Sequence, residues 1–314
     1  MGKKMNQDYE QIEEMLRNKR DDLSKGSLRT YARVLHSFNK RMYDDSFIDG
    51  QRYIEDKEKI IKDLADKKPN SIRTLLSAII LITEDNQFRQ LMSQKIYEHR
   101  KFIDKNEMTE KQKENWISKE EVEEKLMLYK KMSDSLYKRL TFPKVVVQSI
   151  QDYIILCLCC GEYIAPRRST DFCNMKIRLT KKEMEKNDCN YMAKGKFVFN
   201  DYKTAKTYGQ QVIDIPRKLQ LILKKWMTVN DTDFLLINSN GQQLTPTTLG
   251  QRLTEMFGKR VGTTSFRRLF LTDKYENTIK EMKELEEDMK DMGSSKAQAN
   301  HYIKDTSELD KKKN

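Results

Sequence analysis

The feature that most constrains the fold is the confinement of strand-forming segments to one stretch of a 314-residue chain. Lys196–Tyr202 and Gln210–Ile215 are rich in apolar and β-prone residues, and Pro216 ends the second segment. Lys203–Gly209 between them is rich in lysine and ends in a glycine that tolerates a positive φ, which predicts the tip of a β-hairpin. Asp233–Asn238 is one further candidate strand. Because apolar residues elsewhere recur at helical spacing, the sequence predicts a mostly α-helical protein with a small β-sheet.

Two helical stretches and a polar segment define the first domain. Apolar residues recur on one helical face in Leu28–Phe38 and again in Ile72–Ile80. Each face needs a partner to be buried, so a small helical bundle follows. Lys101–Asn115 is rich in Lys, Glu and Asn and is typical of a linker or a solvated turn region. We therefore expect a helical domain over residues 1–115.

The second domain, residues 116–314, begins with a helix-capping signal. Ser118 is followed three residues later by Glu121, which is the pattern of a capping box. The apolar segment Asp152–Tyr163 predicts a buried helix. Further helical patterns follow at Thr247–Phe257, Thr264–Lys274 and Glu276–Met292. We expect an α/β domain in which these helices surround the hairpin.

Charge and cysteine usage narrow the class of protein. The chain has 60 Lys and Arg residues against 48 Asp and Glu, a net charge of +12, which favours a polyanionic partner but also fits a merely lysine-rich soluble protein. Three of the five cysteines, Cys157, Cys159 and Cys160, fit buried thiols in a reducing compartment, and no pair of cysteines has zinc-ligand spacing with a histidine nearby. Neither a membrane span nor a signal peptide is evident. We expect an intracellular, soluble protein of the cytoplasm or nucleus, without a metal or cofactor.

Four short signals with reactive side chains follow one another in the second domain. They are Arg167 and Arg168 with Asp171, then Lys203 and Lys206, then Thr264 with Arg267 and Arg268, and finally Ser294 with Tyr302. Taken singly, each is typical of a solvated surface. Together they suit cleavage of a phosphodiester without a metal, which needs fixed cations around the non-bridging oxygens. Arginine fits this task because its planar group stays charged and donates two hydrogen bonds.

In this order the signals resemble the tyrosine recombinase (phage-type integrase) family, and in particular its divergent members in large DNA viruses and mobile elements. The resemblance covers residues 152–302. The family's first catalytic arginine lies three positions before an acidic residue, as Arg168 lies before Asp171. Its second arginine is followed by His or Lys, and here Arg267 is followed by Arg268. Its nucleophilic tyrosine lies near the end of the chain, as Tyr302 does.

The sequence departs from the family pattern at two histidine positions. Thr264 stands where the second arginine block normally begins with histidine, and Ser294 stands where the turn before the tyrosine normally has one. Both hydroxyls can donate a hydrogen bond to a phosphate oxygen, but neither can carry a positive charge. His301 is adjacent to Tyr302 and points in another direction on a helix, so it is no substitute. Loss of an assisting histidine costs on the order of 10²- to 10⁴-fold in rate.

The resemblance implies a role for each residue. Tyr302 would attack the phosphorus and form a 3′-phosphotyrosine. Arg168 and Arg267 would clamp the non-bridging oxygens, with Asp171 orienting Arg168. Lys203, or else the second lysine of the hairpin tip, would protonate the leaving 5′-hydroxyl.

The resemblance also implies a partner and leaves alternatives open. A helical core-binding domain and the catalytic domain would clamp double-stranded DNA, as a homotetramer on DNA or a monomer when free. A type IB topoisomerase shares the chemistry, and a decayed recombinase would only bind DNA. A basic structural or RNA-associated protein outside the family would hold Arg168, Arg267 and Tyr302 far apart.

Overall fold

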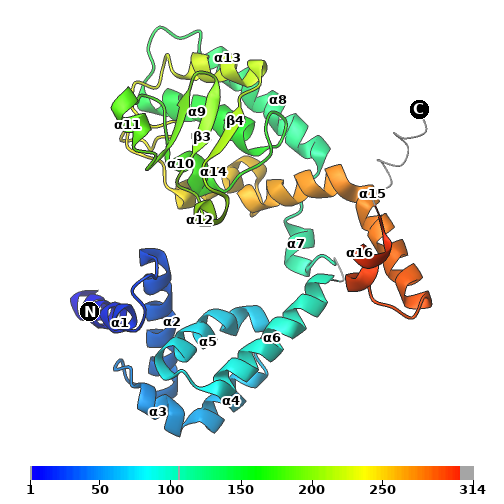
Figure 1. Cartoon of the computed structure of the whole chain (residues 1–314). Helices are drawn as coiled ribbons and strands as arrows, with labels where there is room; N and C mark the ends of the chain where they lie inside the picture. Colours follow the sequence, from blue (N-terminus) through cyan, green and yellow to red (C-terminus); the bar gives the residue numbers. More distant parts are fainter. Residues whose placement is uncertain (1, 105–106, 305–314) are drawn as a thin grey trace. The chain divides into compact units, whose positions relative to one another are not determined.

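The computed structural model describes residues 2–104 and 107–304, and the chain forms two compact units, Met1–Thr109 and Glu110–Asn314 (Figure 1). Most of the described residues are helical, and the strands form one four-stranded sheet, which confirms the predicted fold class. The sequence also predicts a basic tail after Tyr302, and its residues 305–314 lie outside the described residues. No helix in the described part of the chain is long and apolar enough to cross a membrane.

The division between the units falls at Thr109, whereas the sequence predicts it after residue 115. Residues 115 and 116 belong to the second unit because they are hydrogen-bonded to it. The Arg260 N–H donates to Oδ1 of Asn115 over 2.9 Å, and Lys259 Nζ donates to the Trp116 carbonyl over 2.6 Å. Most of the polar segment expected as a linker is helical. It contains the end of α6 and all of α7, which spans Glu110–Glu114.

The first unit consists of helices that share one core. They are α1 (Gly2–Lys19), α2 (Lys25–Tyr43), α3 (Gly50–Glu55), α4 (Lys57–Ala65), α5 (Pro69–Thr83) and α6 (Asn86–Asp104). The apolar faces predicted from spacing meet here, since Leu35 of α2 and Leu76 and Ile79 of α5 are fully buried. This confirms the helical character of the first domain.

The second unit places helices around the sheet. The helices are α7, α8 (Lys119–Leu136), α9 (Lys144–Cys159), α10 (Ser169–Cys173), α11 (Lys181–Glu185), α12 (Ala205–Tyr208), α13 (Arg217–Trp226), α14 (Pro246–Phe257), α15 (Thr263–Asp291), the 3-10 turn η1 (Lys296–Gln298) and α16 (Ala299–Tyr302). The strands, in sheet order, are β1 (Met175–Lys176), β2 (Asn190–Ala193), β3 (Lys196–Phe199) and β4 (Gln211–Asp214). β1 and β2 are parallel, and the other neighbours are antiparallel.

The predicted hairpin is β3 paired with β4, and its lysine-rich tip contains the single-turn helix α12. β1 and β2 were not predicted. The candidate strand 233–238 forms only isolated bridges, Lys176 to Phe234 and Ile237 to Gln243. The reason is a side chain: Gln151 of α9 takes up both backbone hydrogen bonds of Ile237, which a neighbouring strand would otherwise form.

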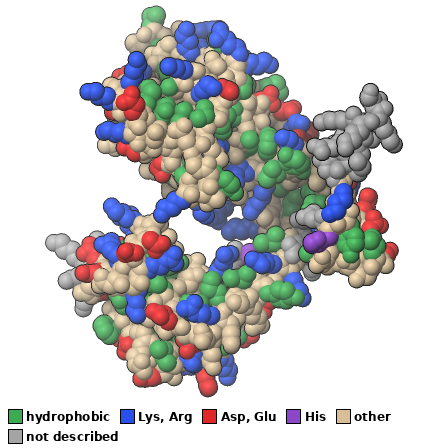
Figure 2. Space-filling view, in the orientation of Figure 1, with side chains coloured by type: hydrophobic (Ala, Val, Ile, Leu, Met, Phe, Trp, Pro, Cys, Tyr) green, Lys and Arg blue, Asp and Glu red, His purple; other side chains and the backbone are tan. Residues whose placement is uncertain are grey.

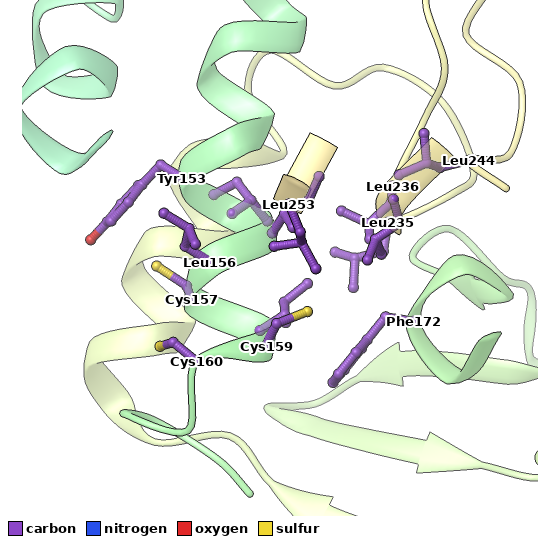
Figure 3. Close-up of a cluster of buried hydrophobic side chains, with 14 of the residues drawn as sticks. Tyr153, Leu156, Cys157, Cys159, Cys160, Phe172, Leu235, Leu236, Leu244 and Leu253 are labelled. Carbon is purple, nitrogen blue, oxygen red and sulfur yellow. The ribbon is translucent and has the colours of Figure 1, made fainter. Parts of the chain in front are cut away.

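Helix α9 lies at the centre of the second core (Figure 3). Cys157, Cys159 and Cys160 are buried at its C-terminal end; in Figure 3, Cys159 points toward the side of Phe172 of α10, and Cys157 and Cys160 point to the opposite side, where Tyr153 lies. Burial raises the pKa of Cys160 to about 11. The cysteines of this helix therefore act as small buried hydrophobes, as predicted.

Helix α15 combines two segments that the sequence predicts separately. They meet at Tyr275, whose φ of −123° and ψ of 24° kink the helix. After α15 the chain reverses at Gly293, whose φ of 70° requires glycine. The Gly293 N–H donates to the Lys290 carbonyl and the Ser294 N–H to the Met289 carbonyl, which is a Schellman cap. This turn directs η1 and α16 back along the outer half of α15.

Candidate phosphate-binding site

The two paired-arginine segments lie against each other at Gly161. This glycine has a φ of +90°, and a Cβ there would lie 3.0 Å from Cδ2 of Phe270 and 3.3 Å from Cγ of Pro166. Pro166 directly precedes the first arginine pair, and Phe270 lies one helical turn after Arg267 on α15. A glycine at this position therefore lets the start of α15 approach the segment that leads into α10.

Arg168 and Arg267 are half-buried cations at this junction. Arg168 is the N-cap residue of α10, and Arg267 lies in the second turn of α15. Within the described residues, neither guanidinium forms an ion pair or a hydrogen bond. A half-buried charge without a carboxylate partner is costly unless a ligand neutralises it. Arg268 and Thr264 are exposed on the first turns of the same helix.

The carboxylate of Asp171 does not hold Arg168, contrary to the prediction from sequence. Asp171 is buried, and its Oδ2 accepts a hydrogen bond from Nε of Arg167 over 2.9 Å. The pair is enclosed, with side-chain exposures of 14% for Arg167 and 2% for Asp171. Asp171 lies on the buried side of α10. Arg167, the first arginine of the doublet, folds back onto that side.

Arg167 makes further contacts that were not predicted. Its Nη1 donates to Oε1 of Gln211 at the start of β4 over 2.9 Å. Its guanidinium lies 3.8 Å from the ring centre of Phe199 and 5.3 Å from that of Tyr202. Tyr202 in turn donates its hydroxyl to the Gly209 carbonyl over 2.7 Å. Arg167 thus joins α10 to both ends of the lysine-rich hairpin tip.

The lysines of the hairpin tip are exposed. Lys203 lies in the turn before α12, and Lys206 lies in α12 itself. As far as the chain is described, neither lysine forms an ion pair. Figure 1 shows α10, α12 and the first turns of α15 at one end of the second unit. The two arginine segments and the lysine segment therefore converge.

Tyr302 does not lie with them. It is the last residue of α16 and 59% exposed. α16 packs on η1, and η1 packs on α15. Figure 1 shows α16 beside the outer half of α15, away from α10 and α12. Ser294 lies in the turn between α15 and η1, so it is also separate from the arginines.

Charge is unevenly distributed over the second unit. Acidic side chains gather on the outer half of α15, where Figure 2 shows them near the C-terminal segment. Lys and Arg side chains are spread over the remaining surface in this view. A polyanion would be repelled from the outer half of α15 and attracted to the convergent arginines and lysines. No cluster of three His, Cys, Asp or Glu side chains among the described residues could hold a metal ion.

Comparison with known proteins adds little. Neither a scan against protein-family models nor a search of curated proteins finds a match. Among solved structures, one match is described as "Crystal structure of XerA recombinase", with a TM-score of 0.32 and 13% sequence identity over 86% of this chain and 85% of that chain. Nothing about function follows from a similarity of that size.

Proposed function

We propose that this protein binds double-stranded DNA and recombines it by tyrosine-mediated strand exchange. The observation that carries the proposal is the convergence of three segments, because the Gly161 contact joins the two arginine pairs and Arg167 joins the first pair to the lysine hairpin. Two half-buried guanidiniums that have no carboxylate partner among the described residues suit the two non-bridging oxygens of a phosphodiester.

In the proposed reaction, Arg168 and Arg267 bind the phosphate while Tyr302 loses its hydroxyl proton to water and its oxygen attacks phosphorus. The new O–P bond forms a 3′-phosphotyrosine, and the bond from phosphorus to the 5′-oxygen breaks. Lys203 donates a proton to that leaving oxygen. A 5′-hydroxyl from another strand reverses the step and restores the phosphodiester, so no external energy source is needed.

Tyr302 must travel to reach the arginines. The kink at Tyr275 is a natural hinge, because the backbone there has already left the helical conformation. A second copy of the chain is the other source of the tyrosine. Mixing Tyr302→Phe protein with Arg168→Ala protein separates these routes, since recovered cleavage in the mixture requires a tyrosine supplied by a partner.

The decisive experiment uses nicked duplex DNA that traps the covalent product. We expect a protein–DNA adduct that survives denaturant and disappears in Tyr302→Phe. Tyr97→Phe is a matched control, because Tyr97 is 60% exposed and lies in the first unit. It should leave the adduct unchanged. Absence of an adduct with the unaltered protein would refute the enzymatic proposal.

A DNA-binding protein that no longer cleaves is the second candidate. The observation that favours it is the pair of uncharged residues, Thr264 and Ser294, where the resemblance implies histidines. This candidate predicts salt-sensitive binding to duplex DNA without any covalent adduct. The same trapping experiment therefore distinguishes the two.

A further inference from the structure

Arg167 is enclosed more completely than a phosphate-binding arginine would need to be. Nε is bound by Asp171, Nη1 is bound by Gln211, and the flat face of the group covers the rings of Phe199 and Tyr202. The carboxylate neutralises the guanidinium, and the side chain is only 14% exposed. These contacts leave Arg167 poorly placed to bind a ligand and well placed to hold other groups in position.

We propose that Arg167 is a positioning residue that fixes the Lys203 loop relative to Arg168. The inference rests on the proposed function, in which Lys203 protonates the leaving oxygen. Arg167 is adjacent to Arg168 in sequence, and it contacts residues on both sides of the loop, Tyr202 before it and Gln211 after it. One guanidinium thus sets the distance between the phosphate clamp and the proton donor.

Arg167 acts beside the other restraints on this loop, which are the bonds of Asn190 to the backbone of Asp201 and the backbone bonds within α12. Lys203 is exposed, with four rotatable side-chain bonds. The Tyr202 hydroxyl closes the loop by donating to the Gly209 carbonyl, and Arg167 holds the ring of the same tyrosine. Loss of Arg167 would remove a contact at each end of the loop. A small displacement of a proton donor is enough to lower its contribution greatly.

The chemistry offers a selective readout. Breaking the bond from phosphorus to the 5′-oxygen requires a proton, because an alkoxide is a poor leaving group. With sulfur at the 5′-bridging position, the leaving group is a thiolate, which is stable without that proton. A defect confined to leaving-group protonation is therefore seen with the oxygen substrate and relieved with the sulfur substrate.

The experiment compares single-turnover cleavage of two nicked duplexes that differ only in this bridging atom. We expect Arg167→Met and Lys203→Ala each to slow cleavage of the oxygen substrate about a hundredfold. Both should cleave the sulfur substrate within about threefold of the unaltered protein. The double variant should be little slower than either single variant, since both changes remove the same step.

Arg252→Met is a matched structural control. Arg252 forms an enclosed pair with Asp152 over 2.6 Å in the same unit, and its side chain is 13% exposed. Arg252→Met should slow cleavage of both substrates equally, or of neither. Equal slowing of both substrates by Arg167→Met would overturn the proposal, because a general structural role or direct phosphate binding has that effect.

Tyr202→Phe covers the case in which Arg167→Met does not fold. It keeps the ring beneath Arg167 but removes the hydrogen bond to Gly209. We expect the same selective loss at about tenfold, and equal loss on both substrates would again overturn the inference. Absence of cleavage of either substrate by the unaltered protein would refute the proposed function itself, and this inference with it.

Discussion

Gln151 offers a quantitative test of how the second unit is held together. It is fully buried in α9, its Nε2 donates to the Ile237 carbonyl over 2.8 Å, and its Oε1 accepts from the Ile237 N–H over 2.7 Å. Gln151→Leu leaves both backbone groups without this partner, at about 1–3 kcal/mol for each group. The carbonyl keeps a longer bond from Gln148, at 3.3 Å, and the leucine adds about 1 kcal/mol of apolar burial. We expect a net loss of about 2–3 kcal/mol.

Tryptophan fluorescence during urea unfolding measures this loss in the right part of the chain. Both tryptophans, Trp116 and Trp226, belong to the second unit. Trp226 is buried, and its indole N–H donates to the Leu235 carbonyl, close to Ile237. Its emission therefore reports the segment that Gln151 anchors.

Gln220→Leu is the matched control. Gln220 is half-buried and donates one hydrogen bond, to the Ile215 carbonyl over 2.7 Å, where water can replace it. We expect a loss of about 1 kcal/mol or less. A Gln151→Leu protein whose unfolding free energy stays within about 0.5 kcal/mol of the unaltered protein would refute the reasoning.

Three further outcomes are expected. Doubling the salt concentration should weaken duplex DNA binding severalfold, measured by fluorescence anisotropy, and flat salt dependence would contradict the electrostatic argument. The hydrogen bond from Arg41 holds the pKa of Asp63 well below its usual range. The contribution of ionised Asp63 to the free energy of unfolding is therefore present above about pH 4 and is lost in stronger acid. Asp63→Asn should lower the free energy of unfolding by about 0.5–1 kcal/mol at pH 7, and by less near pH 2. Urea unfolding followed by circular dichroism measures both values. Burial raises the pKa of Cys160 to about 11 and of Cys173 to about 12, so iodoacetamide at pH 8 should label the half-buried Cys189 well before these two, measured by mass spectrometry.

Short-range sequence patterns correctly predicted the elements that are held by residues close to one another in the sequence. Ser118 caps α8 by accepting the Glu121 N–H, as the capping pattern indicates. The lysine hairpin and the break in α15 at Tyr275 were also predicted from neighbouring residues. β1 and β2 were missed because both are short, and β1 pairs with a strand that follows α11, although β2 itself pairs with β3 across the Lys194–Gly195 turn. The side chain of Asn190 donates to the carbonyls of Asp171 and Asp201, contacts that no periodicity encodes.

In the candidate site too, contacts from distant segments of the chain could not be predicted from sequence patterns. The sequence identified the arginine doublet and Asp171, but not which arginine the carboxylate holds. That choice is made by the aromatic rings of Phe199 and Tyr202 and by Gln211, which come from later segments of the chain. Two adjacent arginines are equivalent in sequence, and tertiary packing gives them different environments.

This difference divides the arginines of the second unit into two kinds. Arg167 and Arg252 are enclosed with Asp171 and Asp152, and removing one partner of such a pair leaves a buried charge uncompensated, at about 3–5 kcal/mol. Arg168 has no carboxylate partner among the residues described, so its removal leaves no carboxylate stranded in this way. In the proposed function, structural stability and phosphate binding therefore depend on different guanidiniums, even where these are neighbours in sequence. Within the described residues, the fold neutralises Arg167 and leaves Arg168 without a carboxylate partner, which is the arrangement that the proposed binding of a phosphate requires.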